Sequence, residues 1–223
     1  MNKTKILASS VALAGLMVIG SAVQAQSINV TVIGTVVPAA CVPTVAGGGV
    51  ADYGDIPAGT LNMTAFNVLA VKTLAFSVTC DQATHIGITT VDNRAASRVP
   101  AAVAAIDPGN NDTYNFGLGT VAGANVGGYI MAFAQGSFTV DGAQVPSMQQ
   151  AVGGTTWAIS RFGSVLNDGG VNSWGLTNAA GPISGEVFAG SLTIQAVLNR
   201  GSVLPLTANV PLDGSATMSI VYL

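Results

Sequence analysis

The sequence predicts an all-β protein folded as an antiparallel β-sandwich, and three observations lead to that prediction. Beyond residue 26 stretches with a period of two recur, and no sustained 3.6-residue period appears. Clusters of Gly, Pro, Asn and Asp separate these stretches. Strands do not alternate with helical patterns, so a parallel α/β sheet is not expected. Such chains form sandwiches or barrels, and a small outer-membrane barrel is less favoured because girdles of aromatic residues are absent.

The first residues predict a secretory signal peptide over residues 1–25. Lys3 and Lys5 precede an apolar stretch over 6–19, and the small-residue pattern over 23–25 predicts cleavage before Gln26. A membrane anchor is the alternative, but the apolar run is shorter than the roughly 18–20 residues that a span needs. We therefore expect one domain over residues 26–223, with no stable membrane span after cleavage.

Two cysteines, Cys41 and Cys80, are expected to form a disulfide. A secreted chain enters an oxidising compartment, where two cysteines usually pair. Their separation of 39 residues makes the cross-link worth roughly 4 kcal/mol in the chain-entropy model. A reactive thiol needs a nearby base, and the chain has a single histidine, His85.

Alternation marks the strands. Over residues 27–36 the even positions are apolar or glycine and the odd ones mostly polar, which predicts a half-buried first strand. Over 74–80 the same alternation places Cys80 on the apolar side. Asp141-Gly142 between two short β runs predicts a hairpin. The region 100–125 is expected to hold a helical turn or a surface loop. Further strands are predicted over residues 85–91, 129–133, 136–140, 155–162, 190–198 and 215–222.

The charge of the chain argues against nucleic-acid binding. Without Lys3 and Lys5 the chain has five basic and ten acidic residues and no basic cluster, so nucleic-acid binding is not expected. The charged fraction is 8%, against about 25% in ordinary soluble domains. A surface of this kind repels itself weakly, and this suits a protein that packs against partners.

The sequence predicts no catalytic, cofactor-binding or metal-binding residues. His85 is the only histidine and Glu186 the only glutamate, so neither a metal cluster nor a carboxylate pair is indicated. No Gly-x-Ser-x-Gly elbow is present. Trp157, Phe162 and Trp174 could line a sugar-binding surface, although aromatic residues more commonly fill a core.

Several segments resemble known secreted proteins of Gram-negative bacteria. The stretch "VIGTVVPAAC" (residues 32–41), followed by Cys80 at a strand end and by the final "ATMSIVYL", resembles chaperone–usher pilins. Over most of the chain, "DYGDIPAGTLN", "VDNRA" and the ending "VYL" resemble the secreted domain of unknown function 1120 family.

The pilin resemblance implies an immunoglobulin-like sandwich that lacks its last strand. The C-terminal edge strand would border an apolar groove, which a periplasmic chaperone fills first and the N-terminal extension of another fimbrial subunit fills later, at an usher. If residues 32–41 form the first strand, Gln26–Thr31 remain in front of it. The candidate donor residues are Ile28, Val30 and Val32, and the candidate edge-strand residues are Ala216, Met218, Ile220 and Tyr222.

These expectations lead to one function and one alternative. The first is a non-enzymatic structural or interaction protein that resembles a fimbrial subunit, located in the periplasm or in a fimbria at the cell surface. The alternative is a monomeric periplasmic β-sandwich that binds an unknown ligand, with Trp157 or Trp174 on the binding surface.

Overall fold

The computed structural model describes residues 28–223, and the predicted signal peptide lies outside that range. Residues 38–223 form one unit, while residues 28–37 belong to a separate N-terminal unit. The larger unit contains two main antiparallel sheets and a two-stranded ribbon, β6 (Thr120–Val121) with β7 (Ala124–Asn125). The predicted all-β fold with one disulfide is therefore confirmed.

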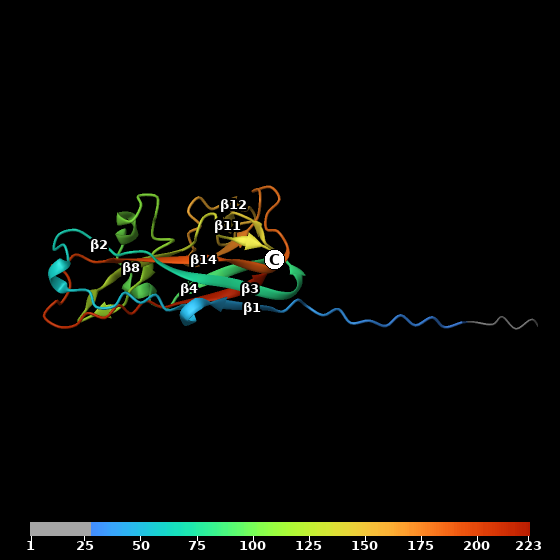
Figure 1. Cartoon of the computed structure of the whole chain (residues 1–223), viewed down its shortest axis with the longest axis horizontal. Helices are drawn as coiled ribbons and strands as arrows, with labels where there is room; N and C mark the ends of the chain where they lie inside the picture. Colours follow the sequence, from blue (N-terminus) through green and yellow to red (C-terminus); the bar gives the residue numbers. More distant parts are fainter. Residues whose placement is uncertain (1–27) are drawn as a thin grey trace, which may run out of the picture. The chain divides into compact units, whose positions relative to one another are not determined.

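The first sheet is organised around its longest strand, β14 (Gly185–Leu198), which runs beside β3 (Lys72–Thr84) for most of its length (Figure 1). On its other side β14 pairs with β8 (Gly127–Phe133). The sheet is completed by β1 (Cys41–Val45) beside β3, β5 (Phe116–Gly117) beside β8, and the short strands β2 (Asn67–Val68), β9 (Thr139–Val140) and β10 (Ala143–Gln144).

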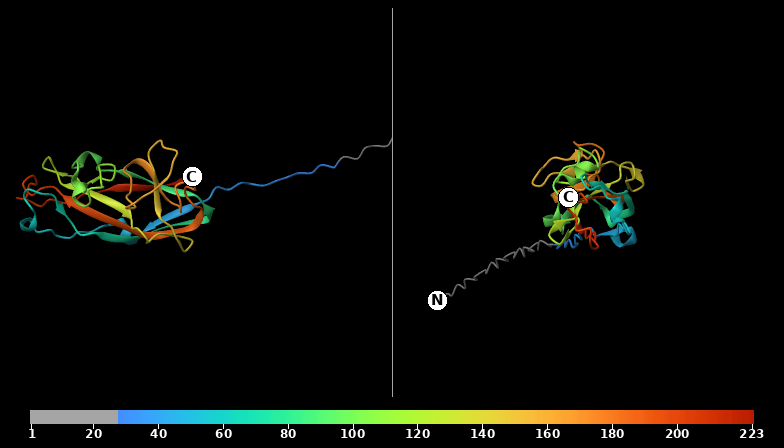
Figure 2. Two further views of the ribbon diagram at one scale, coloured as in Figure 1. Left: turned by 90° about the horizontal axis from the view of Figure 1, so that it is seen from above. Right: turned by 90° about the vertical axis from the view of Figure 1, so that its left-hand side faces the viewer.

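The second sheet has five strands and ends on one side with the C-terminal strand. Its order is β12 (Ala158–Ile159), β11 (Ser147–Gln150), β13 (Asp168–Trp174), β4 (Ile86–Asp92) and β15 (Ala216–Tyr222). The connection between β13 and β14, drawn in orange, projects away from the strands (Figure 2). Short 3₁₀ turns complete the elements: η1 (Ala46–Gly49), η2 (Ala58–Thr60), η3 (Ala95–Ser97) and η4 (Ala102–Ala105).

Aromatic side chains from both sheets form the centre of the core. Trp174 of the second sheet is fully buried and stacks on Phe138, with ring centroids 4.9 Å apart. Phe133 and Phe188 of the first sheet meet the same indole ring at 5.1 and 5.5 Å. Rings at these separations add attraction to the large apolar area that they bury, so this cluster joins the two sheets.

The disulfide joins β1 to the neighbouring strand β3. Cys41 and Cys80 are directly opposite each other in the antiparallel register, and their sulfurs are bonded. Cys80 is buried with the apolar side chains of β3, as its place in the alternation predicted. Because β1 has only five residues and lies at the sheet edge, the cross-link is a major part of its attachment.

The predicted hairpin is confirmed. Val140 pairs with Ala143 across Asp141 and Gly142, whose φ angles are 50° and 83°. Two successive positive φ values are what a two-residue hairpin turn of the primed type requires, and Asp-Gly suits them. In the region 100–125 the helical turn is η4, a single turn with Ala102 and Val103 fully buried.

The predicted first strand is wrong where the structure describes it. Residues 28–37 are in no strand, and the first strand of the described residues begins at Cys41. The pilin resemblance left only Gln26–Thr31 in front of the first strand, whereas β1 begins at Cys41 and residues 28–40 lie in front of it. Alternation shows that an extended segment has one apolar face. It does not show whether that face packs on its own molecule or on another one. Two other predicted strands, over 136–140 and 155–162, shrink to two-residue strands.

Replacing Cys41 with Ser is expected to lower the free energy of unfolding by about 2–4 kcal/mol in oxidising buffer, because the cross-link restricts the unfolded chain. Urea unfolding followed by circular dichroism measures the change. The same comparison in dithiothreitol is the control, since both chains then lack the bond. Equal stabilities in oxidising buffer would contradict the prediction.

Candidate strand-binding groove

An apolar groove lies where the edges of the two sheets face each other. It has a volume of about 580 Å³, and its floor comes from β3, β8 and β14, with β1 and β15 at its sides. Its lining includes Val45, Phe76, Tyr129, Met131, Ile194 and Met218. Burial raises the pKa of the Tyr129 hydroxyl on this floor.

Within residues 28–223, no strand lies beside the edge of β15 that borders the groove. In the second sheet β15 pairs with β4 only. The amide of Asn93 donates to the carbonyl of Ser215, and the amide of Leu223 donates to that of His85. Since bonded pairs alternate in an antiparallel ladder, the odd-numbered residues of β15 bond to β4.

The even-numbered residues of β15 therefore turn their backbone N–H and C=O groups toward the open edge. The side chains of Ala216, Met218 and Ile220 pack against the core. These residues, with Tyr222, are the edge-strand candidates that the sequence predicted. The structure thus places an unpaired backbone edge next to an apolar surface, which is the arrangement that strand addition requires.

A hydroxyl group joins the two sides of the groove at the C-terminal end of β15. The amide of Cys41, the first residue of β1, donates to the Tyr222 hydroxyl over 3.0 Å. Figure 1 shows the C-terminus next to the start of β1. Because Cys41 is also bonded to Cys80, this contact ties the end of the second sheet to a covalently anchored point of the first.

Beyond the other end of β15 the groove continues into a second depression. This depression has a volume of about 890 Å³ and lies between residues 50–61 and 204–212. Val50, Tyr53 and Leu212 line both spaces. The Tyr53 hydroxyl donates to the carbonyl of Ile194 and accepts from the amide of Ala196, so it fixes the shared wall to β14. Burial is the main cause that raises the pKa of Tyr53.

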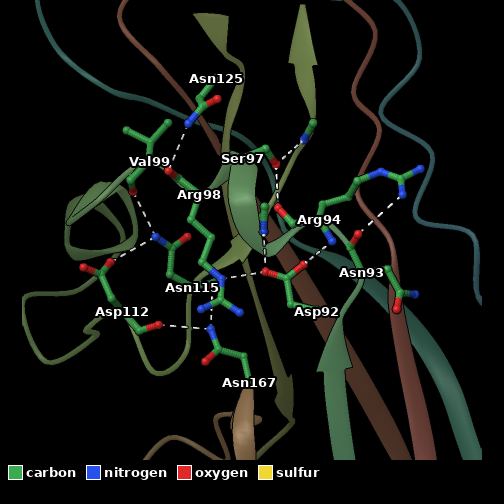
Figure 3. Close-up of polar contacts among 12 residues, drawn as sticks. Asp92, Asn93, Arg94, Ser97, Arg98, Val99, Asp112, Asn115, Asn125 and Asn167 are labelled. Atoms are coloured by element: carbon green, nitrogen blue, oxygen red, sulfur yellow. Dashed lines mark hydrogen bonds and ion pairs between the residues drawn. The ribbon is translucent and has the colours of Figure 1, made fainter. Parts of the chain in front are cut away.

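A polar network holds the beginning of β15 in place, and Figure 3 draws the part of it around Asp92. Its centre is Asp92 at the end of β4, whose side chain is fully buried. One carboxylate oxygen accepts from Arg98 Nε at 2.6 Å and from the amide of Gly117 at 3.0 Å. The other accepts from the amide of Arg94 at 2.8 Å. The carboxylate thus fixes the turn after β4 on the first sheet.

The two residues after Asp92 reach from that turn to the start of β15. The Asn93 side-chain amide donates to the hydroxyls of Ser215 and Thr217, at 3.1 and 3.0 Å. Arg94 forms a two-pronged ion pair with Asp213, at 2.8 and 3.0 Å. That contact lowers the pKa of the Asp213 carboxyl and raises the pKa of Arg94. Sequence reasoning quoted these residues only as part of the "VDNRA" motif and missed their role, although the motif itself was the available signal.

The residues considered for chemistry do not come together. Trp174 is fully buried, so its suggested place on a ligand surface is wrong, whereas Trp157 is partly exposed. His85 is exposed at the start of β4. Within residues 28–223, no three His, Cys, Asp or Glu side chains gather where they could hold a metal ion. Over the same residues, none of the helices has the length and apolar character needed to cross a membrane.

The candidate donor residues lie in the N-terminal unit and are almost fully exposed. Ile28, Val30 and Val32 have exposed fractions of 88%, 85% and 92%. Val36, two alternating positions further, is 97% exposed. Four branched apolar side chains at even positions are therefore exposed to solvent, on a segment that belongs to no strand of its own chain.

The sequence of this chain is similar to that of a known protein family. The model of a family described as "Protein of unknown function (DUF1120)" matches residues 30–148. This chain belongs to the DUF1120 family. The matched region of this DUF1120 protein contains β1, both cysteines of the disulfide, and Asp92 with the three residues bonded to its carboxylate, Arg94, Arg98 and Gly117.

Two proteins of Escherichia coli K12 are similar to this DUF1120 protein over nearly their whole length. Protein GltF is 28% identical over an alignment of 232 positions, which covers 91% of each chain. Uncharacterized protein YhcF is 26% identical over an alignment of 253 positions, which covers both chains completely.

Replacing Asp92 with Asn is expected to lower the free energy of unfolding by about 2–3 kcal/mol, because hydrogen bonds to a charged group in a buried position are lost. Chemical denaturation at pH 7 measures the change. Asp213→Asn is the matched control, since it removes an exposed carboxylate from the neighbouring ion pair and should cost much less. A loss of equal size in the two variants would contradict the central role of Asp92.

The ion pair of Arg94 predicts a pH dependence. The folded-state pKa of Asp213 is lowered, so the pair stabilises the fold above the ordinary aspartate pKa of about 3.9. That contribution is lost as the pH falls through the lower folded-state value. The stability difference between the wild type and Arg94→Gln should therefore narrow between pH 5 and pH 2.5, as urea unfolding can measure. A difference that is constant over this range would refute the assignment.

Proposed function

We propose that this protein is a non-enzymatic structural subunit, similar to a fimbrial subunit, whose open sandwich is completed by an extended strand from another molecule. The observation that carries the proposal is the edge of β15. It leaves four residues with outward-facing backbone groups, and the first two of them, Ala216 and Met218, line the apolar groove. Added strands bind through main-chain hydrogen bonds, and alternate side chains fill the surface beneath.

The occupant that fits best is the segment 28–36 of a second copy of this chain. When such a segment lies opposite β15, residues that face Ala216, Met218, Ile220 and Tyr222 turn their side chains into the groove. The apolar even positions of the segment supply a matching series, in which Gly34 is the smallest member. Nine extended residues reach about 30 Å, which exceeds the length of seven-residue β15.

The same edge explains why periplasmic partners are part of the proposal. An unpaired strand edge beside an exposed apolar groove favours aggregation. A chaperone that lends a strand would protect the edge until an usher directs another subunit into its place. The disulfide supports a location in the oxidising periplasm or at the cell surface.

A mixing experiment tests the exchange of strands between copies. Val30→Asp/Val32→Asp places charges on the donor face, and Met218→Arg places one in the groove. In the chain that begins at Gln26, the wild type should form oligomers whose size rises with concentration. Each variant alone should form at most a small fraction of them, because one half of the contact is missing.

Mixing the two variants should give one-to-one dimers, since one variant keeps an intact donor and the other an intact groove. Light scattering coupled to size exclusion measures the masses. Thr31→Asp/Thr35→Asp, on the opposite face of the segment, is the matched control and should assemble like the wild type. Wild type that remains a stable monomer at every concentration would refute the proposal. It would favour the alternative of a monomeric binding module.

A further inference from the structure

We infer that an incoming strand is hydrogen-bonded by β15 alone, and that β1, on the other side of the groove, is a wall that contributes side chains without backbone pairing. The inference rests on the proposed function, in that the groove receives a strand. It adds which of the two edges binds the strand and what disfavours a hairpin between the chain's own N-terminal extension and β1.

The hydrogen-bond pattern of β1 shows which of its residues face the groove. The amide of Asp81 donates to the carbonyl of Ala40 over 3.0 Å, so these two residues form a bonded pair. Alternation then makes Val42 and Thr44 the next residues that bond to β3. The backbone groups of Cys41, Pro43 and Val45 point the other way, toward the open edge.

The outward edge of β1 is almost without available donors. Pro43 has no N–H group. The N–H group of Cys41 is bonded to the Tyr222 hydroxyl. Of the three outward-facing residues of β1, this leaves only Val45 with an N–H group that could bond to an incoming strand. Val45 is also the last residue of β1, because η1 follows directly and Gly47 and Gly48 have positive φ values.

The edge of β15 differs in every one of these respects. None of its outward-facing residues is proline, so all four present both an N–H and a C=O group. Their spacing over seven residues allows a continuous ladder. A proline in an edge strand prevents further pairing, and natural sheets use it in this way. The groove thus has one edge that pairs and one that does not.

This asymmetry also acts on the chain's own N-terminal segment. Residues 28–37 are joined to β1 through Pro38, Ala39 and Ala40 only, so the local way back into the groove is a hairpin with β1. Such a hairpin needs outward-facing N–H groups on β1. Pro43 has none, and the N–H group of Cys41 already donates to the Tyr222 hydroxyl. The backbone of Ala40 is also held on both sides by Asp81, since its amide donates to the carboxylate at 2.9 Å. Pairing with the edge of another copy is thereby favoured over a hairpin on β1.

Amide hydrogen exchange resolved by NMR tests which edge binds. The protein is the chain from Gln26 with Val30→Asp/Val32→Asp, so that its own segment does not compete. The probe is a synthetic peptide with the sequence of residues 28–37, INVTVIGTVV. Saturating peptide should slow the exchange of the Met218 and Ile220 amides at least tenfold and leave the Val45 amide unchanged.

The outcomes separate the inference from the proposed function. Slowed exchange at Val45, with or without β15, would overturn the inference and leave strand binding intact. Unchanged exchange at both edges with saturating peptide would overturn the proposed function together with the inference. A scrambled peptide of the same composition is the control for unspecific apolar binding.

A second measurement addresses the hairpin. Pro43→Thr/Tyr222→Phe, in the otherwise wild-type chain, returns two amides to the open edge of β1. We expect the dissociation constant of the oligomers to be at least fivefold higher for this variant than for the wild type, because the variant's own extension can now pair with β1. Val42→Thr, on a residue of β1 that faces β3 with its backbone, is the matched control. An unchanged dissociation constant of the double variant would contradict the role of the two residues.

Discussion

Backbone N–H and C=O groups must find hydrogen-bond partners, and the proposed function depends on one strand in which half of these groups pair with no other strand of residues 28–223. β15 is bonded to β4 on one side and borders an apolar groove on the other. An edge strand over a solvated surface is ordinary. An edge strand that also borders an uncovered part of the core combines unmet hydrogen bonding with exposed apolar area, and both favour the addition of a strand.

The groove keeps its shape because each of its sides is fastened to the rest of the fold. The disulfide fastens β1 to β3, and the Tyr222 hydroxyl links the end of β15 to the same cysteine. At the other end, Asn93 and Arg94 hold the start of β15, while the buried Asp92 holds the turn that carries them. A binding surface that is already ordered loses less conformational entropy when its partner arrives. Under the proposed function, the network around Asp92 would therefore contribute to strand binding without touching the strand.

The sequence alone was a good guide where a local rule decides the outcome. Alternation correctly placed Cys80 on the buried side of β3 and predicted the C-terminal strand, while the position of that strand at an edge was implied by the pilin resemblance. Asp141-Gly142 correctly predicted a tight turn, because few residue pairs tolerate two positive φ angles. It was a poor guide over residues 28–37, where the same alternation suggested a strand of the sandwich. The polar network around Asp92 was also missed, since the contacts of Asn93 and Arg94 join residues about 120 positions apart.

The sequence by itself determined the all-β class, the pairing of the two cysteines and the apolar face of the N-terminal segment, because composition, parity and a period of two are local properties. Only the tertiary structure decided that β15 has an open edge and that Trp174 lies in the core. It also decided that Pro43 and Tyr222 leave few free N–H groups on the edge of β1 across the groove. These features depend on which strands become neighbours. Neighbours in a sandwich are chosen by the burial of the whole core, which no short stretch of sequence contains.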